Sequence, residues 1–268
     1  MVAGHRIVPI VPRPPPARHE LAGTLLERCH LAGALLPGLR PAGPDSLLAW
    51  AGMGHPLRPQ DVPASLAYLR HPHAQRVVET ATRFGGRWGR SVMEAQALAR
   101  VSHAANPMTW RSSDGFVAAL ESIASEALAR QVRVRTGRVG TVPDRHGLVL
   151  EFVPSEQLSG RLDLLRSWLL DEEIPQVARA AVACQYLACC HPFEDGNGRT
   201  ARMVANALLI QGGMQTNRYM PLHELFVLSL GGMEVRSRMV ELNGAWNAWI
   251  AWFCDLVELT ATVPPDSR

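Results

Sequence analysis

The stretch HPFEDGNGRTAR, residues 191–202, decides how this chain is interpreted. A Gly-Asn-Gly triplet lies at its centre, where glycines allow positive φ and a close approach of the backbone to a ligand. A helix that begins at such a triplet directs unpaired N–H groups and the positive end of its dipole outward, which favours anions. The stretch therefore predicts an anion-binding turn between two helices.

The side chains around the triplet fit a metal-bound polyphosphate. Arg199 and Arg202 stand three apart, so that they leave neighbouring parts of one helix face and can grip separate phosphates. Asp195 offers a hard carboxylate oxygen for Mg²⁺, and His191 can accept a hydroxyl proton at neutral pH. Phe193 is expected to anchor the loop in the core. Each residue alone would also fit a capped turn between core helices, but the combination favours a site.

Apolar residues at helical spacing flank this stretch on both sides and predict a mainly α fold. One region differs, because β-branched residues there surround a turn rich in Pro, Asp and Gly. It predicts a β-hairpin that pairs 138–142 with 148–152. The predicted helices cover residues 20–36, 91–105, 115–132, 155–170, 175–190, 199–213, 222–230 and 245–260.

Proline and glycine divide the chain into three parts. Residues 1–20 are rich in proline and predict a flexible arm, since prolines in succession cannot support a helix. Short helices interrupted by Pro and Gly follow over residues 21–88. Residues 89–262 carry the long helices, the hairpin and the 191–202 stretch, and form the predicted main domain.

Composition favours a globular cytoplasmic protein. Hydrophobic residues make up 47% of the 268 and charged residues 19%, and the N-terminal stretch lacks the pattern of a signal peptide. The net charge of +3 comes from arginine without lysine and forms no stripe, which disfavours nucleic acid as a partner. The five cysteines lack zinc-type spacing and are expected to be buried thiols.

Residues 191–202 resemble the signature of the Fic family, which reads His-x-Phe-x-Asp/Glu-Gly-Asn-Gly-Arg-x-x-Arg. Every fixed position of that signature is matched. The matching residues are His191, Phe193, Asp195, Gly196, Asn197, Gly198, Arg199 and Arg202. The broader resemblance covers about residues 90–260 and implies a Fic-type helical bundle with a β-hairpin flap and an N-terminal helical extension.

The resemblance implies a protein adenylyltransferase that moves AMP from Mg-ATP to a Ser, Thr or Tyr hydroxyl of a target protein. His191 would be the general base, and Asp195 would hold Mg²⁺. Phe193 would lie in the nucleotide site with the backbone and side chains of 196–198, and the two arginines would bind the β- and γ-phosphates. A target segment would dock along the flap by strand addition. The docking edge would comprise Arg138, Val139, Gly140, Thr141 and Val142.

Many Fic proteins carry an inhibitory helix with Ser/Thr-x-x-x-Glu-Gly/Asn, whose glutamate pairs with the second arginine of the signature. The nearest match here is Ser91-Val92-Met93-Glu94-Ala95, which departs in the spacing of the hydroxyl and in Ala95. Glu94 is therefore the candidate inhibitory residue, although a glutamate on an amphipathic helix can equally well face solvent.

The sequence leaves the transferred group and the degree of activity open. Residues 236–240 and 221–223 depart from the family's usual pattern, which leaves UMP, GMP or another phosphate-linked group possible as the transferred group. A weakly active regulatory or binding module with the same fold is a second possibility, and a DNA-associated helical regulator is a third. A homodimer is compatible with all of them.

Overall fold

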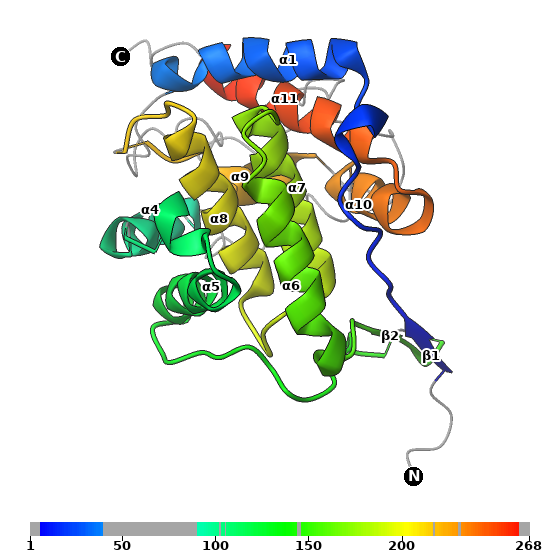
Figure 1. Ribbon diagram of the computed structural model, residues 1–268. Helices are drawn as coiled ribbons and strands as arrows, with labels where there is room; N and C mark the ends of the chain where they lie inside the picture. The colour runs from blue at the N-terminus through cyan, green and yellow to red at the C-terminus, as the bar shows by residue number, and fades with distance from the viewer. Residues whose placement is uncertain are drawn as a thin grey trace, which may run out of the picture.

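The computed structural model describes residues 6–39 and 90–262, apart from 102, 105, 144, 145, 217, 230 and 231 (Figure 1). Most of the predicted N-terminal helical region, from residue 40 to residue 88, lies outside the described residues. Its first helix is described and agrees with the expectation for 20–36.

The described part of the chain is mainly helical, as predicted. The helices are α1 (Gly23–Ala34), α4 (Arg90–Arg100), α5 (Ser113–Leu128), α6 (Ser155–Leu169), α7 (Gln176–Cys190), α8 (Asn197–Gln211), α9 (Leu222–Leu228), α10 (Gly232–Asn243) and α11 (Trp246–Thr262). The predicted helix over 115–132 ends early, because Ala129 adopts a left-handed conformation with φ 51°. Helix α10 was not predicted, since its sequence GMEVRSRMVELN is largely polar.

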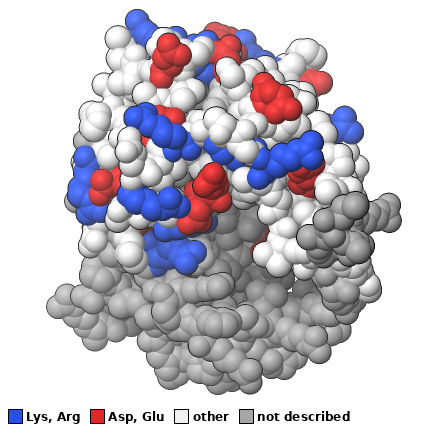
Figure 2. Space-filling view, turned by 90° about the horizontal axis from the view of Figure 1, so that it is seen from below, with Lys and Arg blue, Asp and Glu red and all other residues white. Residues whose placement is uncertain are grey.

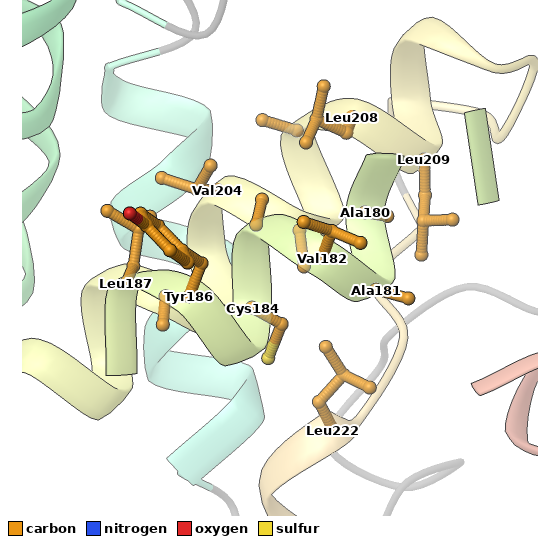
Figure 3. Packing of buried hydrophobic residues seen from close by; sticks show 14 of the residues in the cluster. Ala180, Ala181, Val182, Cys184, Tyr186, Leu187, Val204, Leu208, Leu209 and Leu222 are labelled. Carbon is orange, nitrogen blue, oxygen red and sulfur yellow. The ribbon is translucent and has the colours of Figure 1, made fainter. Parts of the chain in front are cut away.

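Helices α7 and α8 form the centre of the molecule (Figure 1). Nearly every residue of α7 is buried, which agrees with its run of Ala, Val, Cys and Leu. In Figure 3, Val204 and Leu208 of α8 lie on one side of α7, and Leu222 of α9 lies on the other side, toward Ala181 and Cys184. The small residues of α7 let the neighbouring helices approach closely, and this packing sets the turn at residues 191–196 on a rigid base.

The other helices surround this pair. Helices α1 and α11 cross one end of it, and the indole of Trp249 in α11 donates to the carbonyl of Ala181 at 2.8 Å. Helices α4 and α5 pack along α8, and α6 packs on α7 (Figure 1). The α7–α8 turn therefore lies at the opposite end of the bundle from α1, next to the flap.

The predicted hairpin is present, but its first arm is irregular. Strand β2 (Leu148–Glu151) receives a hydrogen bond from Thr141 to Leu150, and Phe152 donates to Val139, both at 2.9 Å. A single antiparallel bridge joins Gly140 to Glu151. We refer to these two arms, residues 138–142 and 148–152, as the flap.

The prediction of a flexible arm over 1–20 is wrong for residues 6–20. Strand β1 (Arg6–Pro9) pairs in parallel with β2, in the register Arg6 with Leu148 through Pro9 with Glu151 (Figure 1). Beyond it, the carbonyl oxygens of Pro12, Pro14 and Pro16 accept hydrogen bonds at 2.7–3.0 Å. The donors are Arg161, Trp246 and Trp168. Proline prevents a helix but leaves the carbonyl free to accept, so an extended proline segment can be fixed by donors from the bundle.

All five cysteine thiols are buried, as expected. No helix in the described ranges is long and apolar enough to cross a membrane.

The central helix pair carries a direct stability prediction. We expect Leu208→Ala to lower the free energy of unfolding by about 2–5 kcal/mol, because it leaves a cavity between α7 and α8. Leu164 on α6 is 43% exposed, so Leu164→Ala serves as the matched control. It should change the free energy of unfolding by less than about 1 kcal/mol. Urea unfolding followed by circular dichroism measures both; equal losses would contradict the central role of α8.

Candidate functional site

The turn between α7 and α8 is sharp at both ends. His191 ends α7 in a left-handed conformation with φ 47°, and its N–H donates to the carbonyl of Leu187 at 3.1 Å. Gly196 precedes α8 with φ 80°, and a Cβ atom there would lie 2.8 Å from the side chain of Leu128. A residue other than glycine at 196 would therefore be strained and would collide with α5.

The imidazole of His191 is fixed from two sides. Its Nδ1 lies 2.6 Å from the carbonyl oxygen of Ala188, which can only accept a hydrogen bond, so Nδ1 carries the proton in the neutral ring. The ring stacks on Phe152 of the flap, with the two centroids 3.6 Å apart. This tautomer leaves the lone pair on Nε2, the arrangement that a general base requires.

Burial lowers the pKa of His191 below its ordinary value of 6.5, and the hydrogen bond to Ala188 opposes this shift. The charge of the nearby Arg135 lowers this pKa further. The imidazole is consequently neutral, and able to accept a proton, at neutral pH.

Arg135 joins the turn to the flap. Its side chain is buried, and its guanidinium donates to the carbonyl oxygens of His191 at 2.6 Å and Gly137 at 2.8 Å, and also to that of Val153. The backbone N–H of the same residue donates to Pro192 at 2.9 Å. A cation at the carboxyl end of α7 is favoured by the helix dipole, although burial lowers the pKa of this guanidinium. Sequence analysis did not identify Arg135, because carbonyl acceptors leave no mark in a sequence.

Two predicted ligand residues instead brace the turn. The side-chain oxygen of Asn197 accepts from the N–H of Phe193 at 2.9 Å, and its amide nitrogen donates to the carbonyl of Phe193 at 2.8 Å. The ring of Phe193 is fully buried in the core. Asn197 can therefore offer its backbone N–H but not its side chain to a ligand. The buried ring of Phe193 agrees with the expectation that it anchors the loop in the core.

The start of α8 has the open geometry that the predicted anion site requires. Its first N–H groups have no partner within the helix, and no side chain caps them. Arg199 stands beside them, tied at 3.0 Å to the carbonyl of Ala127 and half-exposed. The carboxylate of Asp195 is mostly exposed, with one oxygen accepting from the N–H of Gly196 at 2.6 Å and the other 3.5 Å from Arg199.

The donor set near Asp195 fits a magnesium ion that is held mainly by its ligand. No group of three or more His, Cys, Asp or Glu side chains suited to a metal occurs in the described ranges. Mg²⁺ is commonly held by one or two carboxylates together with phosphate oxygens and water, and Asp195 supplies one such oxygen at the anion site.

Arg202 pairs with Glu94 across the helices α8 and α4. Nη2 of Arg202 lies 2.5 Å from one carboxylate oxygen of Glu94, and Nε lies 3.2 Å from the other. Both side chains are buried, and the hydroxyl of Tyr219 donates to Glu94 at 3.0 Å. Although burial lowers the pKa of Arg202, the charge of Glu94 outweighs it and holds that pKa above its usual value. Glu94 thus faces the second arginine of the motif rather than solvent.

Arg202 also lies close to the start of α8. A Cβ atom on Gly198 would be 3.3 Å from Nη1 of Arg202, so the guanidinium approaches the backbone of the first helical turn. The carboxylate of Glu94 therefore binds Arg202, the arginine that is predicted to bind phosphate, next to the anion site. Tyr219 was missed by sequence analysis, since nothing in its neighbourhood marks it.

The predicted docking residues of the flap are accessible. Arg138 and Val142 have most of their surface exposed, and Gly140 and Thr141 are also exposed, whereas Val139 is half-buried. Arg138 lies 3.5 Å from Glu151 of β2. The structure thus brings the flap, His191 and the start of α8 together at one end of the bundle.

Comparison with known proteins agrees with this geometry. Residues 117–209, from α5 to α8, match the sequence profile of the Fic/DOC family. The chain contains a Fic domain. It is 36% identical over 83 residues to protein adenylyltransferase fic-1 of Caenorhabditis elegans, which is 30% of this chain and 16% of that protein. It is 39% identical over 62 residues to protein adenylyltransferase Fic of Nematostella vectensis, 22% of this chain and 14% of that protein. The match thus spans a small part of each relative.

Solved structures share the fold. A Fic family protein from Desulfovibrio desulfuricans superposes with a TM-score of 0.56 at 15% identity, over 93% of this chain and 75% of that one. Fic-1 from C. elegans gives 0.52 at 19% identity, over 89% and 70%. At these identities the likeness concerns the arrangement of helices.

Charges around the Fic-domain site are mixed. Seen from the end that carries the α7–α8 turn, arginine and acidic side chains lie interspersed over the described surface (Figure 2). This described surface has no single-signed stripe of the kind that binds a nucleic-acid backbone.

Arg135 provides the first test of the site. We expect Arg135→Ala to lower the free energy of unfolding by about 1.5–3 kcal/mol, because several buried carbonyls lose a charged donor. Arg133 is exposed and forms a surface ion pair with Glu121, so that Arg133→Ala should cost less than about 1 kcal/mol. Thermal and urea unfolding compare the two variants. An effect of Arg135→Ala as small as that of Arg133→Ala would refute the role of Arg135 in holding the turn to the flap.

His191 provides the second test. We expect its imidazole to titrate below 6.5, since burial disfavours the charged ring, with Nδ1 protonated in the neutral form. Nuclear magnetic resonance of ¹⁵N-histidine-labelled protein measures both, with His191→Gln used to assign the signals. A midpoint above 6.5, or a proton on Nε2, would contradict the site geometry.

Proposed function

We propose that this Fic-domain protein transfers AMP from Mg-ATP to a hydroxyl side chain of a target protein. The observation that carries the proposal is the imidazole of His191, held with Nε2 available as a base beside the open N-terminus of α8. The naming of both relatives as protein adenylyltransferases supports the choice of reaction.

Each residue then has one task. Nε2 of His191 takes the proton of the attacking hydroxyl, whose oxygen forms a bond to the α-phosphorus while the bond from that phosphorus to the bridging oxygen breaks and pyrophosphate leaves. The N–H groups at the start of α8 stabilise charge on the α-phosphate, and Arg199 holds the remaining phosphates. When bound, Mg²⁺ would neutralise phosphate charge at Asp195.

The resting protein is proposed to be inhibited by Glu94. A phosphate oxygen and the Glu94 carboxylate require the same donors of Arg202, so the pair excludes a productive γ-phosphate. Tyr219 supports the inhibited arrangement by its bond to Glu94. This contact also accounts for a Fic-fold regulatory module with little turnover, because such a module would be the same protein with Glu94 permanently in place.

The proposal extends to the partner and the place of action. The target is a protein with an accessible hydroxyl on an extended segment, which docks at the flap, and the reaction takes place in the cytoplasm. The transferred nucleotide is AMP by preference.

Replacing Glu94 tests the proposal. We expect Glu94→Gly to raise label transfer from ATP to protein about 5- to 150-fold, the usual range of a coupling between two sites. Adding His191→Ala to that variant should lower the rate again by about 10²- to 10⁴-fold, since the general base is lost. Four α-labelled nucleoside triphosphates are compared with Mg²⁺, using autoradiography and mass spectrometry.

Glu126→Gln is the matched control for a Glu94→Gln variant, because Glu126 also pairs with an arginine, Arg100, but on the surface. Only the change at 94 should raise the rate and increase the stabilisation of the protein by ATP in a thermal shift assay. If the enzyme transfers label faster from another nucleoside triphosphate, the nucleotide of that triphosphate, and not AMP, is the transferred group. Transfer that is unaffected by the loss of His191 would overturn the mechanism.

A further inference from the structure

The flap carries a strand that belongs to neither of its arms. Strand β1 lies against β2 on the side opposite to residues 138–142, so the flap becomes part of a three-stranded arrangement with β2 in the middle (Figure 1). The pairing continues beyond β1, since the N–H of Ile10 donates to the carbonyl of Glu151 at 2.6 Å. The chain thus fills one edge of its own flap with its own residues 6–10.

This strand runs toward the proposed base. Continuing the register of β1 on β2 by one residue places Ile10 opposite Phe152, and paired residues of neighbouring strands place their side chains on the same face of a sheet. The ring of Phe152 stacks on His191. Ile10, which is 8% exposed, therefore lies next to the ring that touches the imidazole.

The segment has no hydroxyl to modify. Residues 1–23 contain no Ser, Thr or Tyr, and Thr24 is the first such residue of the sequence. An extended segment beside the site without an acceptor resembles a target in shape but not in chemistry.

The strand is weakly held along its length but firmly tethered. It is short, and Ile7 and Pro9 are exposed, so Ile10 supplies most of the apolar surface that its departure exposes. The bonds to Pro12, Pro14 and Pro16 fix the chain directly after it, which gives residues 6–10 a high effective concentration at β2. Such a strand can leave and return without loss of the fold.

No further strand can add outside β1 without a defect. Backbone groups of alternate residues face the same neighbour, so Val8 and Ile10 direct their N–H groups to β2, whereas Ile7 and Pro9 face away. Pro9 has no N–H to offer on that outer side. An incoming segment must therefore displace β1 from β2 or use the other edge of the flap.

We propose that a target segment docks at the β2 edge of the flap, where Phe152 stacks on His191, rather than along residues 138–142. Residues 6–10 then act as a built-in, non-modifiable competitor for that segment. The proposal rests on the proposed AMP transfer and adds a second control to it, on the target side. If β1 is docked on β2 in about nine molecules of ten, the apparent affinity of the flap for the target segment falls about tenfold.

The first experiment gives the competitor a hydroxyl. In the full chain carrying Glu94→Gly, the additional change Ile10→Thr should lead to AMP at position 10 when the protein is incubated with Mg-ATP. The new oxygen would bond to the α-phosphorus, its proton would pass to His191, and pyrophosphate would leave. The control is Val11→Thr, a near-isosteric change at the next residue, whose side chain points to the other face of the strand. Peptide mapping by mass spectrometry locates the AMP.

The second experiment displaces the strand. Val8→Pro removes an N–H that faces β2, whereas Ile7→Pro removes one that faces outward, so the two make a matched pair. The probe is a synthetic peptide of residues 5–12 with Ile10→Thr, supplied to each variant in the Glu94→Gly background. The Val8→Pro enzyme should label it about tenfold faster at low peptide concentration. Hydrogen exchange should show faster exchange of Glu151 in Val8→Pro alone.

The outcomes separate the two proposals. AMP at position 10, or faster labelling of the peptide by the Val8→Pro enzyme, would support the competitor. Equal peptide labelling by Val8→Pro and Ile7→Pro, with position 10 unmodified in a chain that labels other hydroxyls, would show that β1 only supports the flap. A Glu94→Gly chain that stays folded and binds ATP but transfers nothing to any hydroxyl would refute the AMP transfer itself, and the competitor with it.

Discussion

The turn between α7 and α8 depends on one constraint: two helices must reverse direction while the ends of both remain available for chemistry. The left-handed His191 ends α7, and Gly196 starts α8 where no Cβ fits beside Leu128. The turn between them is held by paired hydrogen bonds from Asn197 to Phe193 and by the guanidinium of Arg135. Because the polar groups of the turn are satisfied internally, the imidazole and the first N–H groups of α8 need no ligand to be in position.

Arg135 also links that turn to the flap, since it bonds His191 on one side and Val153 on the other. The stacking of Phe152 on the imidazole makes the same connection through an aromatic contact. A flap that held a target segment without these links would be free to shift against the base. The two contacts make the position of an extended segment on the flap and the position of Nε2 parts of one rigid arrangement.

The sequence was informative where a residue type has few structural roles, and uninformative where the same residue type fits several roles. The glycines and charged residues of 191–202 predicted the turn and its anion site, and the helical spacing predicted α5 to α8. Glu94 was left between two interpretations, because a glutamate on an amphipathic helix does not reveal which face docks; the contact with Arg202 decides the geometry. Phe193 was correctly expected to anchor the loop in the core, but the side chain of Asn197 was assigned to the ligand although it braces the turn, which no spacing could show.

The prediction of a flexible arm was wrong for a different reason. Proline content argues correctly against a helix, but it says nothing about whether donors of a distant element will meet the carbonyls, and Trp168, Trp246 and Arg161 do so more than a hundred residues away. Long-range pairing of this kind also gives β1 its register on β2.

The buried pair and the added strand approach the same turn from different sides. Glu94 supplies a negative charge where the proposed phosphate would bind, and β1 supplies a backbone where the proposed peptide would lie. Glu94 offers the same negative charge as the phosphate that it excludes, and β1 offers the same extended backbone as the peptide that it excludes. They differ in the cost of release, because breaking the buried ion pair leaves Arg202 uncompensated, whereas the release of the strand exposes mainly the side chain of Ile10. A phosphate compensates Arg202 as it displaces Glu94, and a target strand restores the hydrogen bonds of β2 as it displaces β1, so each ligand replaces the interactions that it breaks.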